Sequence, residues 1–479
     1  MKKILILFLA FLLFYCHSEE QPSAALSPGK QIVILYTNDE HGWMEPTENR
    51  GGAPGLVGLW KKYEHYGESN SILILSGGDM WTGPAISTLT QGKSMVEVMN
   101  AMGYSAAALG NHEFDFGVDS LRKRVTEMKF PILAANIAYK NSKKSVDFVQ
   151  PYILKEVNGL SVGIIGLASL ITPRTTRLDY VRNFKFLPYD KTLKKIVPKV
   201  RSKGAELIVL IGHICRDEQL ALAPLADSLG IAVIGGGHCH HSYAELDSGV
   251  AVIQSGAHLE NYAKVEILFD QRADTIISII PSYHQNQPEA ADSVVNAVVE
   301  RWRLNMDDEL KQVIGYTDVE IPERSVVMQN MITDSWLFVY PSADIALTNT
   351  GGIRQSIPPG EITIETIFGV LPFQNTILDL ELTGSELTDC IDSSFIFSGI
   401  TTINGYWLSN GTPIHNDSVY HVLTNDFLYG QSFVNFAKYD KDPYDTGINY
   451  RQPLINWLQS MGSDSKHPIN IYLDTLSRK

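Results

Sequence analysis

Histidine, aspartate and asparagine side chains follow five short apolar runs in the first half of the sequence. Any one of them would more often be a hydrogen-bonded structural residue or a helix cap than a ligand. Together they offer carboxylate, imidazole and amide-oxygen donors, which suit divalent ions such as Zn²⁺, Mn²⁺ or Fe²⁺. They are too many for one ion, so we expect two ions that share a bridging carboxylate, an arrangement used for displacement at phosphorus. These side chains are Asp39, His41, Asp79, Asn111, His213, His238 and His240.

The elements that must position these side chains are buried strands. Continuous apolar runs bounded by glycine are typical of strands that are covered on both faces. Helix-like stretches, such as 92–102 and 118–128, separate the runs, so we expect an α/β fold with largely parallel pairing. In such sheets ligands bind beyond the carboxyl ends of the strands, where these polar residues fall. The runs are 32–36, 72–75, 106–109, 207–211 and 231–234.

Length and composition bound the class of protein. The chain has 479 residues, of which 44% are hydrophobic and 19% charged, so it can build the cores of two to four domains. Its formal net charge of −14 argues against a protein that grips nucleic acid by the phosphates. Four cysteines in a chain of this length exclude a scaffold built from disulfides.

The amino terminus is typical of an exported protein. A short basic start precedes an apolar run over 4–15, which is too short to span a membrane and resembles the core of a secretory signal. Cys16 follows directly, so we expect a lipoprotein signal with lipid on Cys16 as the only link to a membrane; ordinary cleavage near 23–25 is the alternative. We therefore expect a periplasmic protein or a membrane-anchored lipoprotein facing outside the cytoplasm. Cys215, Cys239 and Cys390 then remain, and at least one of the three must stay unpaired within the chain.

The blocks around the strand-end residues resemble the calcineurin-like metallophosphoesterase signature, and more closely the bacterial and animal 5′-nucleotidase family. They occur in the family's order over about 240 residues: TNDEHG at 37–42, GGD at 77–79, GNHEFD at 110–115, GH at 212–213 and GHCH at 237–240. The resemblance implies an N-terminal four-layer α/β/β/α metallophosphoesterase sandwich and a second α+β substrate-binding domain, joined by a helix. It also implies two divalent ions as cofactors, with Zn²⁺ or Mn²⁺ expected.

The resemblance further implies a role for each site residue. Asp79 resembles the bridging ligand. His112 resembles the catalytic histidine that meets the phosphoryl oxygens, and Asp115 resembles its carboxylate partner; a carboxylate favours the charged imidazole, which can stabilise negative charge. We do not expect Cys239 to be a ligand, because alternate side chains of an extended loop point in opposite directions. The ligands implied for the first ion are Asp39, His41 and His240, and those for the second are Asn111, His213 and His238.

The rest of the chain predicts a second domain. We expect edge strands over 265–269 and 276–281, then an amphipathic helix over 289–307 with apolar residues spaced by three and four. The predicted organisation is a signal or lipoprotein segment over 1–27, a metallophosphoesterase domain over 28–283, a linker helix over 284–312 and a C-terminal domain over 313–479.

A glycine pair stands out in this second domain. Gly351 and Gly352 permit close backbone approach, and Arg354 offers a planar fork for phosphate; the alternative is a tight turn with a solvated arginine. The segment resembles the 5′-nucleotidase C-terminal domain, which binds the nucleoside and one side of the phosphate. The substrate-binding residues that this resemblance implies are Asn349, Gly351, Gly352, Arg354 and Arg324, with Phe373 and Phe433 as the two aromatic rings that stack on the base.

We therefore expect a hydrolase that releases phosphate from nucleoside 5′-monophosphates, and from related nucleotides, outside the cytoplasm. A 2′,3′-cyclic-nucleotide phosphodiesterase or a UDP-sugar hydrolase is the alternative on the same scaffold. A non-catalytic surface binding protein is the rival from a different class. The partners expected are a small nucleotide substrate and no nucleic acid, and the sequence indicates no oligomeric state.

Overall fold

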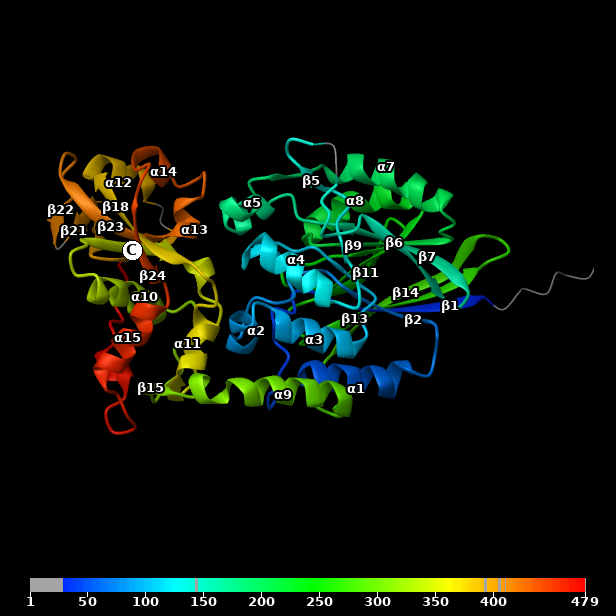
Figure 1. The fold of residues 1–479 in the computed structure, drawn as a ribbon, viewed down its shortest axis with the longest axis horizontal. Helices are drawn as coiled ribbons and strands as arrows, with labels where there is room; N and C mark the ends of the chain where they lie inside the picture. Colours follow the sequence, from blue (N-terminus) through cyan, green and yellow to red (C-terminus); the bar gives the residue numbers. More distant parts are fainter. Residues whose placement is uncertain (1–28, 143–144, 392–393, 404–405, 410, 479) are drawn as a thin grey trace, which may run out of the picture.

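The computed structural model describes residues 29–142, 145–391, 394–403, 406–409 and 411–478. These residues form two bodies that a long helix, α9 (Ser293–Leu310), joins along one side (Figure 1). The signal segment predicted over 1–27 and the lipid site predicted at Cys16 lie outside the described residues. Among those that are described, no helix is long and apolar enough to cross a membrane.

The first sheet of the amino-terminal body carries three of the five predicted strands. β1 to β4 run parallel, while β13 and β14 pair antiparallel beside β1. The prediction that both late strands lie at an edge is wrong for β13, because β13 pairs with β1 on one side and with β14 on the other. The order is β14 (Thr275–Gln285), β13 (Asn261–Asp270), β1 (Lys30–Thr37), β2 (Ile72–Ser76), β3 (Ala106–Ala108) and β4 (Ile132–Leu133).

The second sheet carries the other two predicted strands. β7, β9, β10 and β12 run parallel, and the antiparallel strands β6 and β11 close its edges. The order is β11 (Ser242–Asp247), β12 (Val250–Ser255), β10 (Ile231–Gly235), β9 (Leu207–Gly212), β7 (Leu160–Leu167) and β6 (Tyr152–Val157).

The two sheets pack face to face, with helices on both outer surfaces. Ile32 and Ile34 of β1 lie in the core between the sheets, whereas Val33 and Leu35 lie in the core under the helices. Each strand is therefore covered on both faces, which explains its unbroken apolar run. The expected four-layer α/β/β/α sandwich is confirmed. On the first sheet lie α1 (Gly52–Glu64), α2 (Ala85–Leu89), α3 (Lys93–Met102), α4 (Gly117–Glu127) and α9; on the second lie α7 (Tyr189–Ser202) and α8 (Arg216–Ser228). The remaining elements of this body are β5 (Ile137–Tyr139), α5 (Thr172–Thr175), α6 (Leu178–Val181) and β8 (Phe184–Phe186).

The joining helix α9 begins at Ser293 rather than at the predicted 289. The Asp292 carboxylate accepts the backbone N–H groups of Val294 and Val295 at 3.0 and 2.9 Å, which fixes the helix start. α9 packs against α1 and α3 and then leads into the second body (Figure 1).

The second body is an α+β unit. Its five-stranded sheet has the order β19-β16-β23-β18-β24, and α10 and α15 pack together beside it. Its α11 packs against α2 and α9 of the first body. The strands are β15 (Val313–Thr317), β16 (Ile345–Asn349), β17 (Gly360–Thr363), β18 (Thr376–Thr383), β19 (Phe395–Ser398), β20 (Ile400–Ile403), β21 (Tyr406–Ser409), β22 (Thr412–Pro413), β23 (Val419–Asn425) and β24 (Tyr444–Asn449). The helices are α10 (Val326–Val339), α11 (Ile364–Val370), α12 (Gly384–Cys390), α13 (Asp426–Tyr429), α14 (Phe436–Tyr439) and α15 (Gln452–Met461).

A disulfide joins Cys215 and Cys239, which lie in the loops after β9 and β10. Cys390 is a buried free thiol, so one of the three cysteines is unpaired, as expected. The Cys239 sulfur is therefore committed to this bond.

Candidate metal centre and substrate cleft

The strand-end residues meet at one edge of the sandwich. The loops after β1, β2 and β3 of the first sheet face the loops after β9 and β10 of the second. Gly77 permits this approach, because a Cβ there would lie 2.5 Å from the Gly236 carbonyl oxygen. Five of the site residues have left-handed backbone, with φ from 46° to 74°, a strain that clusters at functional sites. They are Asp39, His41, Asp79, His238 and His240.

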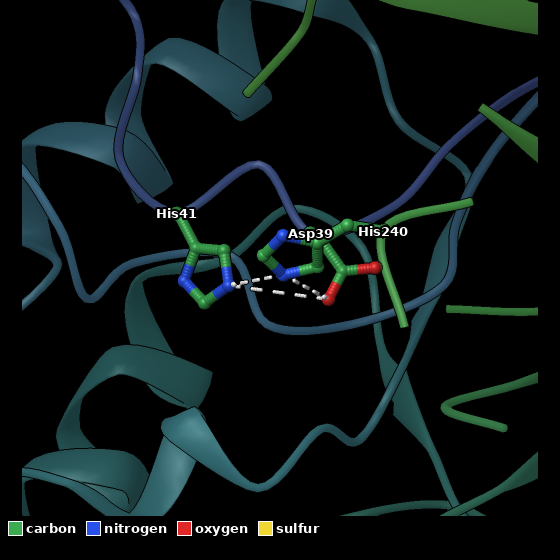
Figure 2. A group of neighbouring side chains, drawn as sticks. All are labelled: Asp39, His41 and His240. Carbon is green, nitrogen blue, oxygen red and sulfur yellow. Dashed lines mark hydrogen bonds and ion pairs between the residues drawn. The ribbon is translucent and has the colours of Figure 1, made fainter. Parts of the chain in front are cut away.

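One group of donors consists of Asp39, His41 and His240 (Figure 2). The His240 Nε2 atom lies 3.5 Å from Asp39 Oδ1, and the His41 Nε2 atom lies 3.9 Å from the same oxygen. The two Nε2 atoms are 3.3 Å apart. His41 donates its Nδ1–H to the Thr82 carbonyl at 2.8 Å, which leaves the Nε2 lone pair directed into the group. Converging donor atoms of this kind fit a divalent cation.

A second group consists of Asp79, His213 and His238. The His213 Nε2 atom lies 2.8 Å from Asp79 Oδ2 and 3.2 Å from His238 Nδ1. His213 donates its Nδ1–H to the Gly77 carbonyl at 2.9 Å, so its Nε2 also faces the group. Asp79 further lies beside His41 and His112, which places it between the two groups.

Asn111 supplies an independent indication of a ligand. Its Nδ2 donates to the Thr175 carbonyl at 3.0 Å, but its buried Oδ1 has no hydrogen-bond partner in the described part of the chain. Burying an unpaired carbonyl oxygen is costly. A cation at this position would satisfy that oxygen, so the residues present fit the second metal ion that the fold implies.

The electrostatics of the donors also fit metal binding. Burial, followed by the charge of Arg354, holds the pKa of His41 well below its usual value. Burial and the neighbouring His213 lower the pKa of His238 to about 4. Burial alone would raise the pKa of Asp79, but His213 and His112 outweigh it and hold that pKa well below the ordinary value. Neutral imidazoles and an ionised carboxylate are the forms that bind metals. His213 differs from the other donors: burial lowers its pKa, but the Asp79 carboxylate outweighs burial and raises that pKa to about 10, so metal binding at His213 would release a proton.

His112 lies beside the second group, and its donor atom converges with those of His41 and Asp79. It begins the short helix η1 (His112–Phe114), and its Nδ1 lies 2.7 Å from the Asp115 Oδ2 atom. Its backbone N–H donates to Asp79 Oδ1 at 2.8 Å. Burial lowers the pKa of His112, but the carboxylates of Asp115 and Asp79 outweigh it and hold that pKa above the usual value. The Asp115 contact fixes the ring and leaves Nε2 for the cleft.

The second body closes over these groups. A cavity of about 790 Å³ is lined by residues of both bodies, including Asn349, Gly351, Gly352 and the side chain of Arg354. Arg354 Nη2 lies 3.4 Å from His41 Nε2. The Phe373 ring stacks on His112 with centroids 5.4 Å apart, and the Arg354 guanidinium lies 5.7 Å from the Phe373 centroid. The glycine-pair segment therefore faces the donor groups across the cleft.

Two predicted substrate residues have different surroundings. The Arg324 side chain lines the cavity but is 88% exposed and pairs with the adjacent Glu323 at 3.1 Å. Phe433 is 64% exposed and is not among the residues that line the cavity. Phe427, on α13, lines the cavity instead. The sequence around Phe427 contains no motif that would predict a substrate contact.

Sequence reasoning also missed a buried carboxylate that supports the site. Glu113 accepts the backbone N–H groups of Asp79, Met80 and Gly110 at 2.9, 2.7 and 2.7 Å. It thereby ties the loop after β2 to the loop after β3. Glu113 directly follows His112 in a loop that is expected to hold a metal ligand, and this position could have indicated a supporting role.

Known proteins similar to this chain include nucleotide-cleaving enzymes. The family model for the 5′-nucleotidase C-terminal domain matches residues 312–402. The chain is 25% identical to the trifunctional nucleotide phosphoesterase YfkN of Bacillus subtilis over 83% of the chain, but spans only 32% of that protein's length. It is 28% identical to human 5′-nucleotidase over 76% of the chain and 72% of that protein.

The fold has a close counterpart among solved structures. The 5′-nucleotidase precursor of Thermus thermophilus superposes with a TM-score of 0.80 at 24% identity, covering 94% of this chain and 98% of that one. The matched domain model, the similarity to 5′-nucleotidases over most of the chain and the shared two-body fold support the 5′-nucleotidase family and a hydrolase of phosphoric esters.

Proposed function

We propose that the chain hydrolyses nucleoside 5′-monophosphates to nucleoside and phosphate with two divalent ions, Zn²⁺ or Mn²⁺. One juxtaposition supports this most strongly. The Arg354 guanidinium and the Phe373 ring of the second body lie directly against His41 and His112 of the first. A phosphoryl group and an attached aromatic base are the two chemical parts that such a cleft can hold together.

The metal ions have a complete set of proposed ligands. Asp39, His41 and His240 would hold one ion, and Asn111, His213 and His238 the other, with Asp79 between them. When bound, the ions lower the pKa of a water molecule and offset charge on the phosphoryl group.

The chain's own side chains supply the remaining functions. His112, held through Nδ1 by Asp115, can donate a hydrogen bond from Nε2 to a phosphoryl oxygen when it is protonated. Arg354 can bind the other phosphoryl oxygens through its planar fork. Phe373 offers a face for the base, and Asn349 lies on the same wall of the cleft.

Cleavage of phosphodiesters or pyrophosphates is the second candidate, and the larger of these substrates need a large cavity. The cavity of about 790 Å³ lies at the upper end of the range for small-molecule sites, and the Bacillus subtilis relative is named a trifunctional nucleotide phosphoesterase. Cleavage of 2′,3′-cyclic nucleotides or UDP-sugars would use the same metal centre.

We also propose that the protein acts outside the cytoplasm. The Cys215–Cys239 disulfide supports this, because structural disulfides persist in oxidising compartments. The apolar run over 4–15 is consistent with export, and lipid on Cys16 remains a prediction.

The test is phosphate release from AMP, ADP, ATP, UDP-glucose, 2′,3′-cyclic AMP and a sugar phosphate after loading with Mn²⁺ or Zn²⁺. A phosphatase added afterwards reveals diester cleavage. We expect release from AMP that a chelator abolishes and that the His112→Ala variant lowers by about 10²–10⁴-fold. Products from the cyclic nucleotide or UDP-glucose alone would favour the second candidate. A metal-loaded protein that binds AMP without turnover would instead be a binding protein.

A further inference from the structure

Three consecutive residues of the first body touch three different parts of the site. The Thr175 carbonyl accepts the Asn111 Nδ2–H at 3.0 Å. The Thr176 hydroxyl donates to Asp115 Oδ1 at 3.2 Å. We name residues 175–177, which end α5 and follow it, the cleft segment. Its first two residues therefore hold a proposed metal ligand and the partner of the proposed catalytic histidine.

The third residue of the cleft segment reaches across to the second body. Arg177 Nη1 lies 3.0 Å from Asp426 Oδ2, and the two side chains are only 29% and 11% exposed. Figure 1 shows α5 facing α13, which begins at Asp426. Partial burial shields this ion pair from solvent, so it is stronger than a fully exposed pair.

Both ends of the ion pair are anchored. The Arg177 guanidinium lies 4.8 Å from the centroid of the Tyr180 ring. Asp426 accepts Asn375 Nδ2 at 2.7 Å and the Thr376 hydroxyl at 3.2 Å. The pair thus joins two preorganised loops and also fixes the turn that carries Phe427 into the cavity.

We propose that Arg177 is a positioning residue that couples closure of the two bodies to the placement of Asp115 and Asn111. The inference rests on the proposed function. Consecutive Cα atoms are about 3.8 Å apart, so the backbone of Arg177 cannot shift far without moving Thr175 and Thr176. When Asp426 holds Arg177, Thr176 occupies one oxygen of Asp115 and leaves the other to His112. Release of the ion pair frees the cleft segment and loosens both contacts.

A double-mutant cycle in the full chain tests the coupling. The variants are Arg177→Gln, Asp426→Asn and the combination, with kcat and KM measured for AMP. We expect each single change to lower kcat by about 10-fold, since small misplacements at a reacting centre cost one to two orders of magnitude. The combination should cost no more than either single change, because both remove the same contact. Arg177→Lys, which keeps the charge, should recover most of the loss.

A matched control is Arg122→Gln. Arg122 forms a two-point pair with Asp147 at 2.6 and 2.7 Å, but within the first body and outside the described cleft. The kcat of this variant should match that of the wild type. Small-angle scattering without substrate should give a larger radius of gyration for Arg177→Gln and an unchanged one for Arg122→Gln.

Several results would overturn the coupling. They are losses that multiply to about 100-fold in the combined variant, a kcat of Arg177→Gln within twofold of the wild type, or an unchanged radius of gyration. If Arg177 bound substrate directly, its loss would appear in KM and Asp426→Asn would not reproduce it. A wild type that releases no phosphate from any nucleotide refutes the proposed function and this inference together, whereas an active wild type with an unaffected Arg177→Gln refutes the inference alone.

The hydroxyl of Thr176 is tested separately. Thr176→Val removes the donor to Asp115 with little change in volume and should lower kcat without changing the radius of gyration. Thr176→Ser restores the donor and should restore the rate. Equal losses in the two variants would show that packing, and not the hydrogen bond to Asp115, is what matters.

Discussion

Removal of the Arg354 side chain tests whether the second body contributes to phosphate binding. Its Nη2 lies 3.4 Å from His41 Nε2, and its guanidinium is 5.7 Å from the Phe373 centroid, so the fork is directed at the donor groups. Two charge-assisted hydrogen bonds to a phosphoryl group are worth about 1.5 kcal/mol each at the lower end of the usual range. Arg354→Ala should therefore raise the barrier by about 3 kcal/mol, which lowers kcat/KM for AMP by roughly 150-fold.

The assay is the initial rate of phosphate release by protein of measured metal content. Metal content matters because Arg354 touches His41, and a lost ion would mimic a lost phosphate contact. Arg354→Lys keeps the charge but not the planar fork, so an intermediate loss is expected. Arg324→Ala provides a comparison: its side chain is 88% exposed and already paired with Glu323, so the loss should stay below about fivefold. A kcat/KM of Arg354→Ala within fivefold of the wild type, at full metal content, would refute the reasoning.

Three further predictions concern binding, stability and reactivity. Phe373→Ala should raise KM for AMP by about 5- to 150-fold, the equivalent of 1–3 kcal/mol of stacking. Phe433→Ala should change KM less than twofold because that ring is 64% exposed; a rise as large as that of Phe373→Ala would restore the assignment made from the sequence. Loss of the Cys215–Cys239 bond, by Ser at both positions, should lower the free energy of unfolding in urea by about 3 kcal/mol for a closed loop spanning 24 residues, and an unchanged midpoint would contradict this. Burial raises the pKa of Cys390 to about 12, so almost no thiolate forms at pH 8. A chain that begins at residue 29 should therefore show no thiol that reacts with Ellman's reagent at pH 8. The same chain should show one reactive thiol after unfolding without reductant.

Much of the metal centre could be predicted from the sequence because it follows from strand ends. A buried parallel strand is recognisable as an apolar run, and its carboxyl end is where the topology places ligands. Asp39, Asp79 and His213 each occupy that position, and the structure brings them together. The position of each strand within its sheet was harder to predict from the sequence. The run over 265–269 is expected to be an edge strand, yet β13, which contains it, pairs on both sides.

The substrate side of the cleft was harder to predict because loops, not periodic elements, form it. The resemblance of residues 429–433 to a family loop implies Phe433 as a stacking ring, and the structure places Phe427, on α13 after β23, at the cavity. The Arg177–Asp426 pair joins residues 249 positions apart, and neither residue lies in a block that the sequence marks. Nothing local distinguishes an arginine that pairs across a cleft from a solvated one.

The first body carries the proposed metal donors and the second body carries the aromatic residues at the cleft, and this separation bears on substrate specificity. The proposed donors of the metal centre follow the ends of strands whose two faces belong to different cores. Phe373, in the loop before β18, and Phe427, on α13, belong to the second body, which supplies none of the donors in the two groups described above. We therefore expect changes at Phe427 to alter which nucleotide is held, whereas changes at Phe373 should also act on His112, on which its ring stacks. We expect the sandwich to supply the metal donors and His112, the second body to supply Arg354 and the aromatic faces, and the cleft segment to make the two bodies act together.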